Sequence, residues 1–316
     1  MRAVYLEQGI VSVRDIMPQA LPPGFARIRM LAAGICNTDL ELLRGYYKFH
    51  GVPGHEFCGE VVEGPTEWLG RRVVGEINLS CGRCEFCAQS MGRHCVRRTV
   101  LGIVSHPGAF AETLTLPVEN LRGVPNQVTT EQAVFTEPIA AACEILDQVV
   151  IEKREQVAIL GDGKLGLLIA KVLHAHGAQV SIFGRHTTKL ALAAQSGIAT
   201  VLAEGDLPRA CYRIVVDATG SASGLRQAVA MTKPRGVVVM KSTVNGETPI
   251  DFAPIIVNEI TLVGSRCGRF EPALELLRTG QVTVDHMIDS RFKLEDAPQA
   301  FARAAAPGVL KVLLTR

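Results

Sequence analysis

The chain has 316 residues, of which 47% are hydrophobic and 20% are charged. This length and composition are typical of a globular protein with two domains of ordinary size. Thirty-three Lys plus Arg against thirty-one Asp plus Glu give a net charge of only +2, which excludes a strong global field for nucleic acid or a membrane surface. We therefore expect a small-molecule partner.

The beginning of the chain, residues 1–9, carries no apolar core of signal-peptide length, and no uninterrupted apolar run of about 18 residues occurs anywhere. We expect a cytoplasmic protein without a membrane segment. In such a compartment nine cysteines favour metal binding and burial over disulfides. Cys58, Cys143, Cys211 and Cys267 stand in apolar or strand-like contexts and are expected to be packing residues.

The first part of the chain, residues 1–144, contains short β-rich segments that Gly and Pro interrupt. These segments lie at 26–34, 57–64, 71–77 and 110–117. Their spacing predicts an antiparallel, partly barrel-like domain.

Four cysteines fall close together inside this domain. Cys81, Cys84, Cys87 and Cys95 form a C-x2-C-x2-C-x7-C pattern. The spacing suits a tetrahedral thiolate cage around Zn²⁺, and a lobe of about 78–98 has too few apolar side chains to fold alone. Disulfides are the competing interpretation, but two C-x2-C pairs would leave only short strained rings. The pattern therefore predicts a closed structural zinc site.

Strands and helices alternate in the second part, residues 145–267. The pattern predicts strands at 157–160, 179–183, 214–219, 236–241 and 260–265, with helices at 165–177 and 189–196. Such alternation is typical of right-handed β-α-β units and a doubly wound parallel sheet, so the fold class is α/β. Residues 268–316 begin with a helix at 271–279 and end with strand, helix and strand, which we expect to rejoin the first domain.

The glycine segment G-D-G-K-L-G joins the first of these strands to its helix. Gly161 allows a tight turn, Gly163 lets the backbone approach a pyrophosphate, and Gly166 allows the helix to pack closely on the strand. The helix N-terminus offers free N–H groups to phosphates. The predicted cofactor loop also includes Asp162, Lys164 and Leu165. The alternative is a glycine turn that serves only chain reversal.

The residue that chooses between NAD and NADP is expected about 20 residues further on. The difference 185 − 166 = 19 puts Arg185 there, and no Asp or Glu lies between Asp162 and Glu204. The 2′-phosphate of NADP would meet Arg185, with His186 and Lys189 close by, so the sequence predicts NADP(H) in preference to NAD(H). The alternative is that Arg185 is a solvated surface charge.

A third set of residues is scattered along the first domain: Cys36, His55, Glu56 and Glu137. Singly, each has an ordinary structural explanation. Together they supply the S, N and O ligands that a catalytic zinc takes while one position stays open. Asp39, which is not itself one of the proposed ligands, can orient the imidazole of His55.

These motifs, in this order, resemble the zinc-dependent medium-chain dehydrogenase/reductase superfamily, which includes the alcohol and polyol dehydrogenases. The matching segments are C-N-T-D, G-H-E, the four-cysteine lobe, E-P, G-D-G-K-L-G and V-D-A-T-G-S. The resemblance implies a GroES-like catalytic domain and a Rossmann domain. Glu137 stands where sorbitol-type and glucose-type enzymes have a Glu, so the match leans towards the polyol and sugar branch.

The resemblance also implies roles for single residues. Thr38 matches the hydroxyl that takes the substrate proton, and Thr219 belongs to the cofactor-binding V-D-A-T-G-S segment. Glu41 replaces the usual relay His, so the proton route is open, with His50 as a substitute. Lys311 falls where relatives place a basic residue that reaches the cofactor pyrophosphate.

The function expected from these patterns is the interconversion of an alcohol or polyol and its aldehyde or ketone. The cofactors expected are two zinc ions per chain and NADP(H). Two alternatives are a reductase of an activated C=C or iminium bond with the same fold, and a non-catalytic zinc or redox-sensing protein. We expect a homo-oligomer, either a dimer or a tetramer, that binds neither nucleic acid nor membrane.

Overall fold

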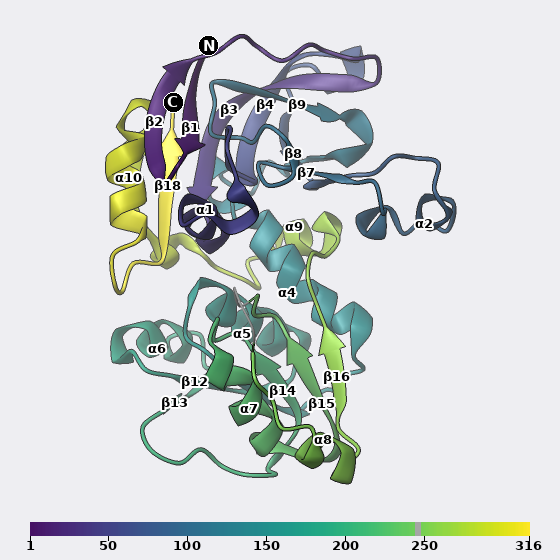
Figure 1. The fold of residues 1–316 in the computed structure, drawn as a ribbon, viewed down its shortest axis with the longest axis vertical. Coiled ribbons are helices and arrows are strands. Elements are labelled where there is room, and N and C mark those ends of the chain that lie inside the picture. The colour runs from purple at the N-terminus through teal and green to yellow at the C-terminus, as the bar shows by residue number, and fades with distance from the viewer. Residues whose placement is uncertain (244–247) are drawn as a thin grey trace. The chain divides into compact units, whose positions relative to one another are not determined.

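A computed structural model describes residues 1–243 and 248–316 of the chain (Figure 1). They form two compact units, one made of Met1–Glu137 and Phe270–Arg316 and the other of Pro138–Arg269. We expected the divisions after residues 144 and 267. In the structure the first division falls inside helix α4 (Thr136–Gln148), which continues from one unit into the other.

The first unit is built on a seven-stranded sheet, in which only the C-terminal strands β17 and β18 pair in parallel. The order is β10-β5-β4-β3-β18-β17, and β9 also pairs with β3. The strands are β3 (Phe25–Ile35), β4 (Glu56–Glu63), β5 (Arg72–Gly75), β9 (Thr113–Pro117), β10 (Leu121–Gly123), β17 (Ile288–Lys293) and β18 (Lys311–Thr315). This sheet confirms the expected antiparallel β-rich domain.

Along β3, buried Ala26, Ile28 and Met30 alternate with half-buried residues, as the period of two requires for a strand with one face in the core. The strand lies between β4 and β18, so its end is held from both sides. Helix α1 (Asn37–Leu43) begins directly after it. This junction positions the candidate site described below.

Smaller elements complete the first unit. They are the hairpin β1 (Arg2–Glu7) and β2 (Ile10–Asp15), the small sheet β6 (Asn78–Leu79), β7 (Thr99–Leu101) and β8 (Ser105–His106), and the helices α2 (Glu85–Ala88), α3 (Thr130–Ala133), α9 (Phe270–Arg278) and α10 (Ala297–Ala304). Figure 1 shows α10 lying along β18. The strand, helix and strand predicted for the tail are thus present, and they join the first unit.

The second unit contains a six-stranded sheet in the order β13-β12-β11-β14-β15-β16, in which every pairing is parallel. Its strands are β11 (Gln156–Leu160), β12 (Gln179–Gly184), β13 (Ala199–Leu202), β14 (Tyr212–Asp217), β15 (Thr232–Met240) and β16 (Thr261–Gly264), and its helices after α4 are α5 (Lys164–His176), α6 (Thr187–Ala194), α7 (Ala222–Met231) and α8 (Ala253–Val257). The order reverses between β11 and β14, where a doubly wound sheet binds its ligands. The predicted Rossmann-type fold is confirmed.

Cysteine burial agrees with the expectation at two of the four positions assigned to packing. Cys58 and Cys143 are buried, and burial raises the pKa of each thiol to about 12. Cys267 is half-buried. Cys211 is exposed, so its predicted packing role is wrong; it stands just before β14, where the chain has not yet entered the sheet.

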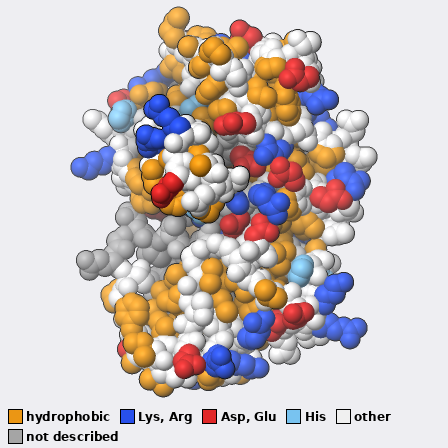
Figure 2. Space-filling view, turned by 90° about the vertical axis from the view of Figure 1, so that its right-hand side faces the viewer, with side chains coloured by type: hydrophobic (Ala, Val, Ile, Leu, Met, Phe, Trp, Pro, Cys, Tyr) orange, Lys and Arg blue, Asp and Glu red, His pale blue; other side chains and the backbone are white. Residues whose placement is uncertain are grey.

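Figure 2 shows one face of the molecule, where acidic and basic side chains are interspersed among hydrophobic ones. This mixture fits the near-zero net charge of the sequence. Within residues 1–243 and 248–316, no helix is both long and apolar enough to cross a membrane.

Candidate functional site

Three of the predicted metal ligands lie where β3, α1 and β4 meet. Cys36 is the residue between the end of β3 and the start of α1, and it caps that helix. His55 immediately precedes β4, and Glu56 is its first residue, paired with Gly34 of β3. The ligand atoms of Cys36, His55 and Glu56 all lie within 4.8 Å of one another. Two antiparallel strands thus bring together residues that are about 20 positions apart in the sequence.

Asp39 ties this junction together from a fully buried position in α1. Its Oδ2 accepts a hydrogen bond from the backbone N–H of Cys36 at 2.8 Å, and its Oδ1 accepts one from Gly54 at 3.2 Å. The same Oδ1 lies 3.5 Å from Nδ1 of His55. One carboxylate therefore fixes the backbone beside two of the candidate ligands and faces the ring of His55.

The electrostatics of the three residues favour a cation. Burial disfavours the charged form of His55, but the Asp39 carboxylate and the Cys36 sulfur outweigh that effect, so the pKa of His55 is raised well above its usual range. His55 is 4% exposed, and its Nδ1 has no hydrogen-bond partner of good geometry. A sulfur, an imidazole and a carboxylate grouped in this way fit the ligand set of a catalytic zinc.

Lys311 supplies positive charge on the other side of Glu56. Its ammonium group donates a hydrogen bond to Oε2 of Glu56, both residues are almost fully buried, and its Nζ lies 5.5 Å from the ring centre of Phe135. Burial opposes the charged ammonium, but Glu56 outweighs it and raises the pKa of Lys311.

Gly34 leaves room for this pair, because a Cβ at that position would lie 2.8 Å from the Glu56 oxygen and 3.0 Å from Cδ of Lys311. The predicted contact of Lys311 with a cofactor pyrophosphate stays a prediction.

The other residues expected near the metal are dispersed around the junction. The thiol of Cys36 lies 3.8 Å from the hydroxyl of Thr38. The carboxylate of Glu41 accepts a hydrogen bond from Arg44 at 2.6 Å, and His50 is exposed. Glu137 is half-buried in the first turn of α4 and is outside the group of three ligands described above. Its proposed binding to the metal, like the roles of Thr38 and Glu41, stays a prediction.

The four cysteines of the lobe converge as the spacing predicts. All four sulfurs lie within 4.8 Å of one another, with 3.4 Å between Cys84 and Cys87 and 3.7 Å between Cys84 and Cys95. A tetrahedral zinc with bonds of ~2.3 Å separates its sulfurs by roughly 3.8 Å, whereas a disulfide joins two sulfurs at ~2.05 Å.

Backbone N–H groups aim at these sulfurs. Hydrogen bonding from the backbone of Arg83 lowers the pKa of Cys81 to about 6. The spacing of the sulfurs in the lobe therefore fits a closed zinc site rather than a disulfide pair.

The glycine segment forms the turn between β11 and α5. Gly161 has φ of +108°, and Gly163 caps α5, whose first turn carries no acidic residue. Lys164, Leu165 and Gly166 form that first turn. The N–H groups of the first turn of α5 thus stand at the carboxyl end of β11, where a phosphate is expected.

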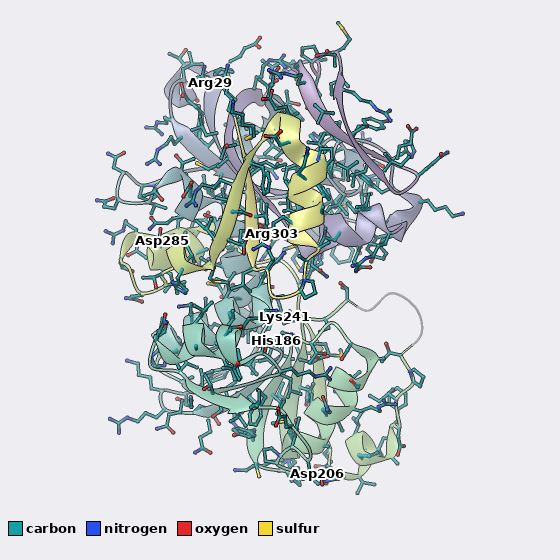
Figure 3. All side chains as sticks on the ribbon, turned by 90° about the vertical axis from the view of Figure 1, so that its left-hand side faces the viewer. Arg29, His186, Asp206, Lys241, Asp285 and Arg303 are labelled. Carbon is teal, nitrogen blue, oxygen red and sulfur yellow. The ribbon has the colours of Figure 1, made fainter. Side chains whose placement is uncertain are left out.

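Arg185 and His186 follow β12, and Lys189 lies in the first turn of α6. Both Arg185 and His186 are exposed (Figure 3 labels His186). Asp162 of the glycine segment reaches across to their backbone, an interaction that the sequence pattern did not predict.

Thr219 follows β14 and is held by Asp217, whose Oδ1 accepts hydrogen bonds from its backbone N–H at 3.0 Å and its hydroxyl at 2.8 Å. Asp217 is 3% exposed. The sequence signal for this anchor was the V-D-A-T-G-S segment, which carries both residues.

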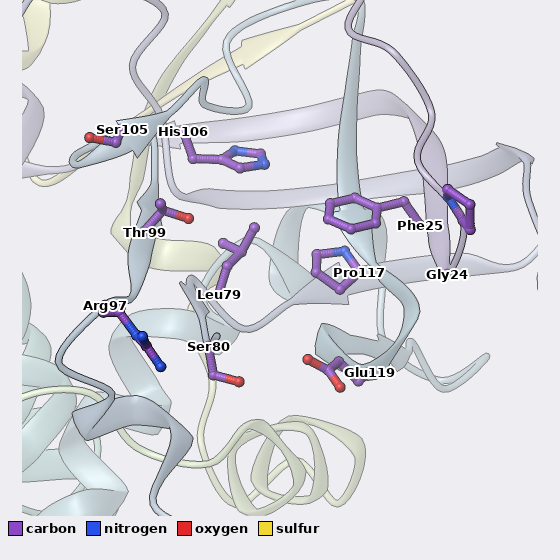
Figure 4. Close-up of a pocket in the computed structure, with 11 residues that line it drawn as sticks. Gly24, Phe25, Leu79, Ser80, Arg97, Thr99, Ser105, His106, Pro117 and Glu119 are labelled. Atoms are coloured by element: carbon purple, nitrogen blue, oxygen red, sulfur yellow. The ribbon is translucent and has the colours of Figure 1, made fainter. Parts of the chain in front are cut away.

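A separate hollow of about 590 Å³ lies beside the four-cysteine lobe (Figure 4). Its lining includes Phe25, Leu79, Arg97, His106 and Glu119. None of the predicted site residues contributes to it, so it is distinct from the Cys36 junction.

Comparison with known proteins agrees with the family that the sequence motifs resemble. Residues 22–126 match the family described as alcohol dehydrogenase GroES-like domain, and residues 165–279 match the family described as zinc-binding dehydrogenase. The L-threonine 3-dehydrogenase of Streptomyces avermitilis is 32% identical over 325 aligned positions, covering 95% of this chain and 94% of that protein. The sorbitol dehydrogenase of Halalkalibacterium halodurans is 29% identical and covers 92% of this chain and 91% of its own length.

One similar solved structure, from Sinorhizobium meliloti, is described as a zinc-binding dehydrogenase bound to NADP. It superimposes with a TM-score of 0.92 at 31% identity and covers 100% of this chain and 99% of its own.

Proposed function

Because this chain belongs to the zinc-dependent medium-chain dehydrogenase/reductase superfamily, we propose that it interconverts an alcohol or polyol and its aldehyde or ketone, with zinc and preferentially NADP(H). That it is an alcohol dehydrogenase-like oxidoreductase follows from the family. The observation that carries the zinc part of the proposal is the convergence of Cys36, His55 and Glu56 to within 4.8 Å.

Cys36, His55 and Glu56 would hold the catalytic zinc, with Glu137 as an exchanging carboxylate. A bound zinc ion supplies Lewis-acid polarisation of the substrate oxygen. Asp39 keeps the Cys36 backbone in place and orients the ring of His55. Lys311 donates a hydrogen bond to the buried Glu56 and so provides the counter-charge that a buried carboxylate requires.

Thr38 is the group proposed to receive the substrate proton. Its hydroxyl lies 3.8 Å from the Cys36 sulfur, within reach of an oxygen held beside that residue. Glu41 accepts a hydrogen bond from Arg44 and provides a further acceptor on the same helix, about one turn further on. The proposed proton route runs from Thr38 towards the surface of α1.

The cofactor phosphates are proposed to bind the N–H groups at the start of α5, with Gly161 and Gly163 permitting the approach. The exposed Arg185 would take the 2′-phosphate. The NADP bound to the similar Sinorhizobium protein supports this choice. Cys81, Cys84, Cys87 and Cys95 would hold a second, structural zinc.

A substrate panel tests the proposal. Metal-replete protein is incubated with alcohols, polyols, sugars and aldehydes, each with NADP(H) or NAD(H), and the nicotinamide absorbance is followed. We expect turnover of at least one alcohol or polyol, with higher kcat/KM for NADP(H). Reduction of activated C=C or iminium substrates alone would contradict the proposal and support the alternative reaction. Absence of both turnover and NADPH binding would reject enzymatic activity of either type.

A further inference from the structure

Asp162 makes an interaction that the glycine motif does not require. It stands in the turn after β11 and is 6% exposed. Its Oδ2 accepts hydrogen bonds from the backbone N–H of Arg185 at 2.8 Å and of His186 at 2.7 Å. The Nδ1 of the His186 ring lies 3.0 Å from both of its oxygens. One buried carboxylate thus links the turn after β11 to the turn after β12.

Gly184 makes room for this carboxylate. It is the last residue of β12, and a Cβ built on it would lie 2.5 Å from Oδ2 of Asp162 and closer still to its Cβ. Contacts under 3 Å between such atoms do not occur without a shift of the backbone or the side chain. The structure can therefore accommodate the Asp162 side chain or a side chain at position 184, but not both in their present places.

Position 184 is also chemically informative. The difference 184 − 166 = 18 places it, like its neighbour Arg185, at the region about 20 residues after the glycine segment where enzymes that use NAD carry the acidic residue that binds the ribose hydroxyls. In this chain the volume of that acidic side chain is taken by Asp162, which approaches from the other loop. Its oxygens already accept from two backbone N–H groups and face the His186 ring.

The charges around the turn complete the arrangement. Because Nδ1 of His186 faces Asp162, the other ring nitrogen points away from the carboxylate, and the His186 side chain is 49% exposed. The Arg185 side chain is exposed as well. Burial raises the pKa of Asp162, but the hydrogen bonds and charge of His186 outweigh it, with a smaller contribution from Lys189, so the pKa of Asp162 is lowered. The Asp162 carboxylate is thus buried beneath the turn, whereas the side chains of Arg185 and His186 are exposed on its outer side.

We propose that Asp162 is a positioning residue for cofactor choice. Together with Gly184 it fixes the turn at residues 184–186 so that Arg185 and His186 face the 2′-phosphate, and it occupies the place of the acid that would bind the ribose of NAD. This inference rests on the NADP(H) preference proposed above. It assigns that preference to a coupled pair of loops rather than to Arg185 alone.

The test measures the contribution of the 2′-phosphate itself. Calorimetric Kd values for 2′,5′-ADP and 5′-AMP are compared in the wild-type protein and in Asp162→Ala. We expect the wild type to prefer 2′,5′-ADP and the variant to lose about ten-fold of that preference, the effect of one charge-assisted hydrogen bond. The Kd of 5′-AMP should change less than about three-fold, because the N–H groups at the start of α5 remain.

Two further variants separate positioning from charge. Asp162→Asn keeps a carbonyl oxygen that can accept from both backbone N–H groups, so it should retain most of the preference. Asp147→Asn, which changes an exposed carboxylate bonded to Arg269, is the matched control and should leave both Kd values unchanged. A rise in 2′,5′-ADP affinity in Asp162→Ala or Asp162→Asn would overturn the inference, since Asp162 would then act only as a repelling charge.

A double-mutant cycle tests the steric coupling. Gly184→Asp alone should lower the Tm, because its side chain meets Asp162. The double variant Asp162→Gly/Gly184→Asp should recover the Tm and prefer 5′-AMP over 2′,5′-ADP. Additive effects of the two substitutions would overturn the coupling. If Asp162→Ala does not fold, the ratio is measured on Asp162→Ser, which keeps one acceptor and should lose part of the preference.

The outcomes distinguish the two proposals. A wild-type protein that binds 2′,5′-ADP no better than 5′-AMP rejects the NADP(H) preference and, with it, this inference. A wild-type preference that survives unchanged in Asp162→Ala, or an equal loss of affinity for both probes, rejects the positioning role of Asp162 while the NADP(H) preference stands.

Discussion

The substitution Asp39→Asn changes only the second oxygen of a fully buried carboxylate into an amide nitrogen. In the wild type, Oδ2 accepts from the backbone of Cys36, while Oδ1 accepts from the backbone of Gly54 and faces Nδ1 of His55. An Asn side chain has a single acceptor oxygen. In either orientation its NH₂ group must face an N–H donor, so one buried donor loses its acceptor.

The expected loss of stability follows from the one buried N–H donor that is left without an acceptor. A buried donor without a partner costs about 1–3 kcal/mol, and we expect the free energy of unfolding of the zinc-loaded protein to fall by that amount. Loss of the charge behind His55 should also weaken metal binding. Changes to groups that orient a zinc-bound His typically cost 10- to 100-fold in affinity, equivalent to about 1.4–2.7 kcal/mol, which agrees with the loss of one charge-assisted hydrogen bond.

The assay is a competition between the protein and a chromogenic zinc chelator, with urea unfolding of the same samples. Asp289→Asn is the control, because Asp289 makes a hydrogen-bonded ion pair with Arg303 near the surface and does not approach the metal ligands. This control should lose at most about 1 kcal/mol of stability and no zinc affinity. If Asp39→Asn retains wild-type zinc affinity at the weaker site, Asp39 does not orient His55 and the reasoning is refuted.

Four further predictions concern the metals, the ligands, the cofactor and pH. Elemental analysis of metal-replete protein should give two zinc ions per chain, and a wild-type content of one or none would contradict the two ligand sets. The variant Cys95→Ser should lose one zinc ion together with the folded lobe, whereas Cys36→Ser should stay folded but inactive. Glu56→Ala and Glu137→Ala should each reduce kcat/KM about ten-fold or more, and wild-type turnover in both would remove them from the site. Arg185→Asp should reverse the ratio of kcat/KM for NADPH and NADH, which an unchanged ratio would disprove. Hydrogen bonds from Arg213 hold the pKa of Glu155 below its usual value, so this pair stabilises the protein above pH ~4.3 and the effect fades as the pH falls through the lower folded pKa. Arg213→Gln should therefore cost at most about 1 kcal/mol at pH 7, and its urea midpoint should approach that of the wild type below pH ~4; a gap that persists there would contradict the assignment.

The element order was accessible from the sequence because it depends on local periodicity. The buried β11 and the amphipathic α5 carry their pattern in the 21 consecutive residues from Gln156 to His176, and the glycine turn between them has a specific composition. The four sulfurs converge for a similar reason, since their spacing alone limits how far apart they can be. Cys36 and His55 were grouped by the chemistry of zinc ligands and by the resemblance to a family, and not from a local pattern.

Contacts between distant segments could not be predicted in this way. Lys311 meets Glu56 across 255 positions, a pairing that depends on β18 lying beside β3. Asp162 was treated only as a member of the glycine motif, because the direction of its side chain depends on the missing Cβ at Gly184. Cys211 was assigned to packing from its strand-like neighbours, yet the chain enters the sheet only one residue later.

The position of β18 between β3 and β17 has a consequence for the synthesis of the protein. The first unit is assembled from the two ends of the chain, whereas the second is continuous from Pro138 to Arg269. On the ribosome, the second unit can therefore complete its sheet while the first still lacks two strands. The last strand also carries Lys311, so Glu56 receives its counter-charge only when residues 311–315 have left the exit tunnel. Until then the nascent chain has the candidate ligands Cys36 and His55 but not the complete sheet that holds them, so the last strand of the first unit is also the element that completes the site.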